Sequence, residues 1–153
     1  MIRNGQYEQK GGLGMQEYSF VEDAEKVGFG WHRVRCYNDK GDEVGLFDYF
    51  IEAPGLITFQ KLFVTKAFRG KGIASILIKH FLELSFYQLH ANCVSVYFFP
   101  SEDSTSIHGL IWLFQKHGFE ITDCKLSGVK GSLNLEAFLN KEKPYPLEEL
   151  SLV

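Results

Sequence analysis

The sequence predicts an α/β fold in which few helices accompany a mixed, mostly antiparallel sheet of about seven strands. Short runs of aromatic and β-branched residues, separated by Gly, Pro and Asn-Asp turn residues, indicate antiparallel strands up to Val64. The apolar spacing then becomes helical from Gly72 to about His90. A strand, a helix and two strands follow, and this strand–helix–strand order predicts one parallel pair within the sheet.

The length and composition are those of one globular domain. The chain has 153 residues, of which 45% are hydrophobic and 23% charged, so it can bury a substantial core. We therefore expect a single domain over residues 1–153. Residues 1–14 are polar and glycine-rich, which predicts a loose arm. Residues 140–153 contain Pro144 and Pro146, which predicts an irregular tail.

Four strands are expected before the first helix. Their ranges are Met15–Val21, Val27–Tyr37, Glu43–Glu52 and Leu56–Val64. The second and third strands form a hairpin because the sequence between them, Asn38-Asp39-Lys40-Gly41-Asp42, is typical of a tight turn. Pro54-Gly55 marks the next turn, so the fourth strand returns antiparallel to the third.

The second half is expected to alternate between strands and one further helix. The strands are Ala91–Phe99, Phe119–Leu126 and Ser132–Leu139. The helix is Ile107–His117, and Gly118 supplies a left-handed cap at its end. Ser101–Ser106 is expected to be a polar loop, and Gly128–Gly131 a turn.

The charge and the cysteine pattern exclude several classes of partner. The net charge is −3, so the chain lacks the basic field on which nucleic-acid binding depends. Cys36, Cys93 and Cys124 have no CxxC spacing and indicate reduced thiols in a cytoplasmic protein. His32 and His90 lack partners at metal-ligand spacing, so no metal is expected. No apolar run approaches the ~20 residues that span a bilayer, so we expect no membrane partner.

The stretch from Leu62 to Ser75 contains the residues with the clearest chemical meaning. It lies where a strand leads into a helix, whose first turn has free backbone N–H groups and a positive dipole end. Gly70 and Gly72 let the backbone approach a bulky anion closely. Arg69 and Lys71 add positive charge at the same place. Together these features predict a pyrophosphate-binding turn. The alternative is a purely structural turn with ordinary surface cations.

Other phosphate-binding motifs do not fit this stretch. A P-loop requires Ser or Thr after its Lys and a Gly five residues before it, but Gly72 follows Lys71 and Lys66 occupies the earlier position. A dinucleotide fingerprint requires a third Gly or Ala, where this chain has Ser75. A kinase glycine loop joins two strands rather than a strand and a helix.

Two motifs resemble those of the GNAT superfamily of acyl-CoA-dependent N-acyltransferases. Arg69-x-x-Gly72-x-Ala74 fits the superfamily motif Arg/Gln-x-x-Gly-x-Gly/Ala, which follows the fourth strand. The run from Leu113 to Phe119 is similar to the second motif, Leu-Tyr-x-x-x-Gly-Phe. The resemblance covers roughly residues 15–140. It implies that the two central parallel strands splay into a V and that acetyl-CoA is the acyl donor.

The resemblance also implies which residues bind the donor. Backbone amides of Leu62 and Val64 would bond the pantetheine arm and polarise the thioester carbonyl. Amides from Arg69 to Ser75 would hold the pyrophosphate. The implied acetyl-CoA-binding residues are Leu62, Phe63, Val64, Arg69, Gly70, Lys71, Gly72, Ile73, Ala74 and Ser75.

The catalytic positions depart from the superfamily pattern. Where members often have a Glu as general base, this chain has Gln60, and where they have a Tyr as general acid, it has Phe114. The catalytic residues are therefore left unassigned. The candidates are Glu52, Gln60, Tyr97 and His108, and Asp48 is a further possible replacement group. The expected function is N-acetyl transfer to a primary amine. The alternative is a weak or inactive acyl-CoA-binding module with a sensory or interaction role.

The acceptor side also departs from the pattern. Members carry one or two helices between the first two strands, but the interval from Val21 to Val27 is too short for them. This predicts an open acceptor groove that suits a large or flexible acceptor such as a protein terminus or lysine. The acceptor itself is expected to be an amine-bearing small molecule or a protein or peptide. A second subunit or the arm 1–14 could close the groove instead. A homodimer would also cover exposed sheet edges.

Overall fold

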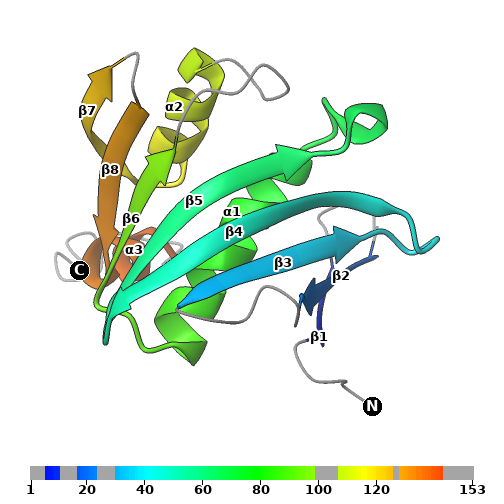
Figure 1. Ribbon diagram of the computed structural model, residues 1–153, viewed down its shortest axis with the longest axis horizontal. Coiled ribbons are helices and arrows are strands. Elements are labelled where there is room, and N and C mark those ends of the chain that lie inside the picture. The colour runs from blue at the N-terminus through cyan, green and yellow to red at the C-terminus, as the bar shows by residue number, and fades with distance from the viewer. Residues whose placement is uncertain (1–5, 11–16, 24–29, 99–106, 126–127, 143–153) are drawn as a thin grey trace, which may run out of the picture.

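The computed structural model describes residues 6–10, 17–23, 30–98, 107–125 and 128–142. Within these residues, eight strands form one sheet in the order β1-β2-β3-β4-β5-β6-β8-β7 (Figure 1). The strands are β1 (Gln6–Lys10), β2 (Glu17–Glu22), β3 (Trp31–Tyr37), β4 (Glu43–Ala53), β5 (Leu56–Val64), β6 (Cys93–Phe98), β7 (Glu120–Lys125) and β8 (Gly128–Asn134). The α-helices are α1 (Ile73–Glu83), α2 (Ile107–Lys116) and α3 (Leu135–Glu142). A π-helical segment, Leu84–Gln88, extends α1.

One parallel pair interrupts the antiparallel sheet, as the sequence predicts. Strands β5 and β6 run parallel from the pair Leu56–Cys93 to the pair Phe59–Val96. Beyond that point β5 continues beside β4, and β6 continues beside β8. The two strands therefore diverge, and Figure 1 shows them splaying into a V. The predicted fold class is confirmed.

The V begins at a β-bulge. Asp48 of β4 is opposite Lys61, and Tyr49 is opposite Phe59, so Gln60 has no counterpart in β4. A bulge bends its strand and increases the local twist. Because Gln60 directly follows the last residue of β5 that pairs with β6, the bend in β5 coincides with the divergence of the two strands.

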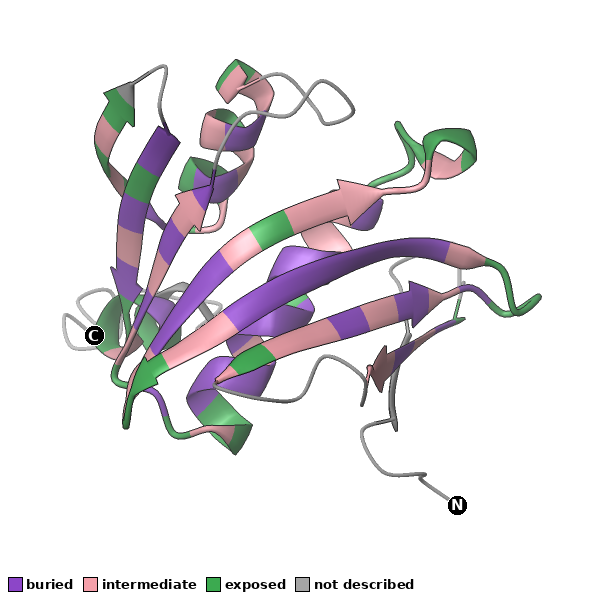
Figure 2. Ribbon diagram, viewed as in Figure 1, coloured by how far each residue is buried: buried purple, intermediate pink, exposed green. Residues whose placement is uncertain are grey.

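The helices pack on one face of the sheet. The buried ring of Phe59 in β5 contacts Phe81 of α1 at a centroid distance of 4.8 Å and Phe114 of α2 at 5.3 Å. Both helices therefore cover the same face, and α3 joins them because Phe138 stacks on Phe86 of the α1 extension at 4.7 Å. Figure 2 shows that α1, behind the sheet, is mostly buried. Aromatic and aliphatic side chains together form this core.

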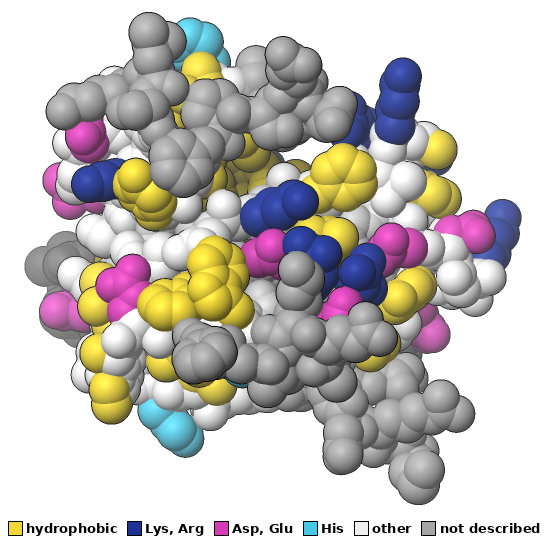
Figure 3. Space-filling view, viewed as in Figure 1, with side chains coloured by type: hydrophobic (Ala, Val, Ile, Leu, Met, Phe, Trp, Pro, Cys, Tyr) yellow, Lys and Arg dark blue, Asp and Glu magenta, His cyan; other side chains and the backbone are white. Residues whose placement is uncertain are grey.

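The opposite side of the sheet, here called the open face, carries Arg33, Asp48, Thr58 and Ser95. These positions follow from strand alternation, because Phe59 points toward the helices and Thr58 next to it points away. None of the α-helices in the described residues lies over this face (Figure 1). Figure 3 views it directly and shows charged side chains of both signs beside hydrophobic ones.

Two expectations about the chain ends are wrong. Residues 6–10, expected in a loose arm, form β1 and pair antiparallel with β2. Residues 135–139, expected in a strand, belong to α3 and so do residues 140–142 of the expected tail. The helix begins there because the Asn134 side chain accepts a hydrogen bond from Ala137 N–H at 2.7 Å, which is N-capping geometry. The rest of the arm and of the tail lies outside the described residues.

The expected turn at Gly128–Gly131 is also wrong, because these residues belong to β8. Gly131 faces the Glu120 carbonyl oxygen, which a Cβ at this position would approach to 2.8 Å. Close packing against β7, rather than a turn, therefore requires glycine at this position. The other strands and helices agree with the expected ranges to within a few residues. Parts of Met15–Val21, Val27–Tyr37, Ala91–Phe99 and Phe119–Leu126, and all of Ser101–Ser106, lie outside the described residues.

A histidine lies inside the core. His80 of α1 is 5% exposed and stacks on Phe20 at a centroid distance of 3.7 Å with a 2° interplanar angle. Its ring also meets Phe47 edge-on at 6.1 Å. Burial favours the neutral imidazole, so the pKa of His80 falls from 6.5 to about 4.

This histidine should make the fold sensitive to acid. The unfolded chain protonates His80 near pH 6.5 and the folded chain near pH 4, so stability falls as the pH drops between these values. The loss from this residue should reach about 3 kcal/mol. Urea unfolding between pH 7 and pH 4.5 should show a shallower pH dependence in His80→Gln. His90→Asn, at an exposed site, should retain the wild-type slope, and equal slopes in all three proteins would contradict the assignment.

Candidate functional site

The inner edge of the V is lined by the backbone of β5. Thr65 donates its N–H to the Val44 carbonyl of β4 at 2.9 Å. Successive peptide groups in a strand face opposite sides, so the backbone groups of Val64 and Leu62 point away from β4 and into the V. In agreement, the Val64 carbonyl accepts a hydrogen bond from Arg69 Nε at 3.0 Å rather than from β4. This is the orientation that the donor-binding role of both residues requires.

The glycine turn follows β5 after a short 3-10 helix, Lys66–Phe68. Gly70 has φ +79° and Gly72 has φ +81°, both in the left-handed region that glycine adopts most readily. A Cβ built on either residue would meet no atom within 4 Å. The backbone conformation, and not a lack of space, therefore requires glycine here, and the outer side of the turn is open to a ligand.

The N-terminus of α1 opens onto this turn. Gly72 is the N-cap and has no side chain to accept a hydrogen bond from the first-turn amides, and the first helical bond runs from Ile76 N–H to the Gly72 carbonyl at 3.3 Å. The amides from Gly72 to Ser75 thus precede the first helical bond and lie at the positive end of the helix dipole. The side chain of Ile73 is buried and anchors the first turn in the core.

Two cations flank the turn. The Arg69 guanidinium lies 5.7 Å from the centroid of the Phe63 ring, and Lys71 Nζ lies 5.5 Å from that of Phe68. Both contacts have cation–π geometry, which holds each charge near the glycine backbone. Uncapped amides, open left-handed glycines and adjacent cations together fit the pyrophosphate of an acyl-CoA.

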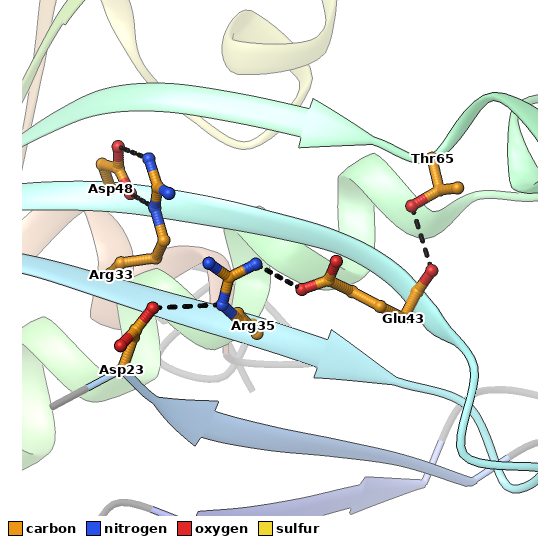
Figure 4. A network of polar contacts seen from close by, with 6 residues as sticks. All are labelled: Asp23, Arg33, Arg35, Glu43, Asp48 and Thr65. Carbon is orange, nitrogen blue, oxygen red and sulfur yellow. Dashed lines mark hydrogen bonds and ion pairs between the residues drawn. The ribbon is translucent and has the colours of Figure 1, made fainter. Parts of the chain in front are cut away.

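A network of ion pairs on the open face supports the strand end from which the turn begins (Figure 4). Arg35 bonds Glu43 at 2.7 Å and Asp23 at 3.2 Å, which ties β3 to β4 and to the end of β2. Thr65 Oγ1 donates to the Glu43 carbonyl at 3.0 Å. Thr65, the first residue after β5, is therefore fixed to β4 by its backbone amide and by its side chain.

Asp48, the further candidate for a catalytic carboxylate, is bound by Arg33. Arg33 Nε and Nη2 donate to the two Asp48 oxygens at 2.6 and 2.9 Å. The hydrogen bond with Asp48 raises the pKa of Arg33. Because both carboxylate oxygens already bind a cation, Asp48 is poorly placed to accept a proton during a reaction.

The four catalytic candidates do not all lie together. Gln60 is the bulge residue at the apex of the V, and Tyr97 lies just beyond the last parallel pair in β6. Glu52, an exposed residue near the end of β4, accepts a hydrogen bond from Thr58 at 2.8 Å on the open face. His108 is exposed on α2, on the helix side of the sheet.

The residue at the usual acid position has a structural role. Phe114 is fully buried and packs against Phe59, Phe98 and Phe119 at centroid distances of 5.3, 5.4 and 5.2 Å. It joins α2 to the core at the base of the V. This position therefore supplies apolar packing, and its side chain has no proton to donate.

Sequence reasoning missed two hydroxyls at the apex. Thr58 is 2% exposed, and its Oγ1 lies 2.8 Å from Ser95 Oγ and 2.8 Å from Glu52 Oε1. The available indication was one polar residue inside each of two apolar runs, Leu56-Ile57-Thr58-Phe59 and Val94-Ser95-Val96. Small hydroxyls are common in strands, so this pattern alone carried little weight.

The described residues include one deeply buried thiol and no metal-binding cluster. Burial raises the pKa of the Cys36 thiol to about 12, so this residue stays protonated and inert. No cluster of His, Cys, Asp or Glu among the described residues is arranged to hold a metal ion. No described helix is long and apolar enough to span a bilayer.

The family of the chain follows from its sequence as well as from this geometry. A family profile described as an acetyltransferase (GNAT) domain matches residues 17–121, which include the V and the glycine turn. The chain therefore belongs to the GNAT family of acetyltransferases. The resemblance based on Arg69-x-x-Gly72-x-Ala74 is confirmed, and by class the protein is a GNAT-type N-acetyltransferase.

Solved structures share this fold at low sequence identity. A variant of the spermidine N-acetyltransferase SpeG from Vibrio cholerae has a TM-score of 0.62 at 17% identity, covering 74% of this chain and 70% of that chain. A dodecameric spermidine N-acetyltransferase from the same organism has a TM-score of 0.62 at 15% identity, with coverages of 74% and 70%. The N-acetyltransferase PseH from Campylobacter jejuni, in complex with acetyl coenzyme A, has a TM-score of 0.57 at 20% identity, with coverages of 71% and 70%. No curated protein matches the chain significantly.

The Arg33–Asp48 pair should contribute to stability. The two side chains are only 17% and 12% exposed, so Asp48→Asn would leave the Arg33 charge partly buried without its partner. We expect a loss of about 2–3 kcal/mol in the free energy of unfolding, measured by urea denaturation. Asp39→Asn, at an exposed hairpin residue, should change it by less than about 0.5 kcal/mol. Equal effects of the two substitutions would show that the pair is energetically neutral.

Proposed function

We propose that this protein transfers an acetyl group from acetyl-CoA to a primary amine. The observation that carries the proposal is that two features lie on one continuous segment. They are the opening of the β5–β6 strand pair at Gln60 and the uncapped glycine turn at Gly70–Gly72. One feature suits a thioester-bearing arm and the other suits its pyrophosphate. The structural neighbour PseH, of the same fold, is solved with acetyl coenzyme A.

The donor-binding roles fall on backbone groups more than on side chains. Leu62 and Val64 would present peptide groups to the pantetheine arm and the thioester carbonyl. The amides between Arg69 and Ser75 would hold the pyrophosphate, with the Arg69 and Lys71 side chains as its counter-charges. Most of the work would then be positional, since holding a neutral amine beside the thioester removes much of the entropic barrier.

The acceptor would approach from the open face. No α-helix among the described residues covers this face, which supports an approach to the apex of the V by a small amine, or by a lysine side chain or N-terminus of a protein or peptide. The neighbours from Vibrio cholerae are named for spermidine, a small polyamine. We favour an amine-bearing acceptor in the cytoplasm and a homodimer that covers an exposed sheet edge.

Binding of the donor can be tested at the turn. Acetyl-CoA at ~100 times its dissociation constant adds about 2.7 kcal/mol, or roughly 5–10 °C in melting temperature. Coenzyme A should behave similarly, and ATP and NAD should not. Gly72→Val should abolish the shift, because φ +81° is strained for valine and the turn must rearrange.

Gly41→Val is the matched control for this substitution. Gly41 has φ +84° and equally open surroundings, but it lies in the β3–β4 hairpin. It should lose similar stability and retain the shift with acetyl-CoA. If neither acetyl-CoA nor coenzyme A stabilises the wild-type protein, the turn is purely structural and the proposal fails.

Turnover separates the two functions that remain if the donor binds. Release of the coenzyme A thiol should require an amine and should rise above the uncatalysed rate with at least one member of a panel of amines and peptides. Binding without any turnover would instead support an acyl-CoA-binding module with a sensory or interaction role. Gln60 and Phe114, which cannot accept or donate a proton as Glu and Tyr do, favour that second function.

A further inference from the structure

A chain of hydrogen bonds crosses the parallel strand pair on the open face. Ser95 Oγ of β6 lies 2.8 Å from Thr58 Oγ1 of β5, and Thr58 Oγ1 lies 2.8 Å from Glu52 Oε1 of β4. Thr58 and Ser95 are direct partners in the parallel register, one position before the last pair. The chain therefore runs across the base of the V, next to the point where the strands separate.

The direction of these hydrogen bonds is fixed by the carboxylate. An ionised Glu52 can only accept, so Thr58 donates its single proton to it. The Thr58 oxygen must then accept the Ser95 proton. The Ser95 oxygen retains its own acceptor capacity, and its side chain is partly exposed. A donor that approaches the apex from the open face can therefore bond to Ser95.

The burial of the residues in this hydrogen-bond series suits the passage of a proton. Thr58 is 2% exposed, so little water competes for its hydroxyl. Glu52, at the other end, is exposed and can exchange a proton with solvent. The bulge residue Gln60 lies two positions from Thr58 and cannot accept a proton. The hydroxyl chain thus connects the apex to a basic group that the usual position lacks.

We propose that Ser95, Thr58 and Glu52 form a relay that takes the proton from the acceptor amine, an inference that rests on the proposed function. As the amine nitrogen bonds to the thioester carbon, its proton moves to Ser95 Oγ. The Ser95 proton moves to Thr58 Oγ1 and the Thr58 proton to the Glu52 carboxylate. The carbon–sulfur bond breaks, and the coenzyme A thiolate takes a proton from solvent. Glu52 then returns its proton to solvent, so the protons balance.

A merely structural role for these hydroxyls makes a different prediction. Hydroxyl pairs across neighbouring strands commonly stabilise sheets, and their loss would lower the melting temperature without altering the pH dependence of the rate. A relay alters that dependence, because its help is needed most where hydroxide is scarce and least at high pH. The pH profile of kcat/KM therefore distinguishes the two roles.

The test compares kcat/KM from pH 6 to pH 10 in five proteins. These are the wild type, Thr58→Val, Thr58→Ser, Glu52→Gln and Ser132→Ala. The acceptor is whichever of propylamine, spermidine and Nα-acetyl-lysine amide turns over fastest. Valine matches threonine in shape but cannot relay a proton, whereas serine retains the hydroxyl. Ser132, directly opposite Ser95 on β8, is the control, because its hydroxyl is not part of the proposed relay.

The relay predicts a distinct pattern in these variants. Thr58→Val and Glu52→Gln should lower kcat/KM about 100-fold near pH 7, and the deficit should shrink toward pH 10, where hydroxide can take the proton directly from the attacking nitrogen. Thr58→Ser and Ser132→Ala should stay within a few-fold of the wild type. All five proteins should retain the thermal shift with acetyl-CoA.

The contrary results are equally distinct. If Thr58→Val or Glu52→Gln retains the wild-type rate and pH profile, the relay is refuted while the proposed function stands. If buried Thr58→Val does not fold, exposed Glu52→Gln decides alone. If the wild type turns over none of the amines, the transferase proposal and the relay fall together, and the acetyl-CoA shift shows whether donor binding survives.

Discussion

The brevity of the contact between β5 and β6 is the constraint on which the site depends. The two strands pair only from Leu56–Cys93 to Phe59–Val96, and the bulge at Gln60 then turns β5 away. The peptide groups of Leu62 and Val64, which a longer parallel ladder would engage, instead face the space between the strands. A regular sheet through this point would leave no site for a thioester. Of the several bulges in the sheet, the one at Gln60 is the one that coincides with the opening.

The core fixes the parts of the site relative to one another. Phe59, at the apex, contacts both α1 and α2, so the strand pair and the two helices share one buried cluster of rings. Ile73, 2% exposed, anchors the first turn of α1 in the same core while the amides beside it face outward. The segment that contains the glycine turn is therefore held at both ends, by Thr65, which is bonded to β4, and by Ile73, which is buried. A binding turn held at both ends needs little reorganisation to receive a ligand.

Local sequence predicted most of the fold, and the proposed donor half of the site also rests on local determinants. The boundaries of β5 follow from a run of mostly apolar residues that begins after Pro54-Gly55, and the turn beyond it follows from two glycines that adopt positive φ. The missed features depend on neighbours distant in sequence. Residues 6–10 are polar and become a strand only by pairing with β2. Thr58 stands out only through its hydrogen bond with Ser95, which lies 37 positions later in the sequence. The start of α3 was an exception, since Asn134 as an N-cap was a local indication that sequence reasoning overlooked.

The central claim is that the inner edge of β5 and the glycine turn together bind acetyl-CoA. Amide chemical shifts of the isotope-labelled protein, followed by NMR as acetyl-CoA is added, test it most directly. The account predicts that the largest changes fall on Leu62, Val64 and Gly70–Ser75, with only small changes at the β3–β4 hairpin. Saturable binding with the principal shifts elsewhere, and none at these amides, would contradict it.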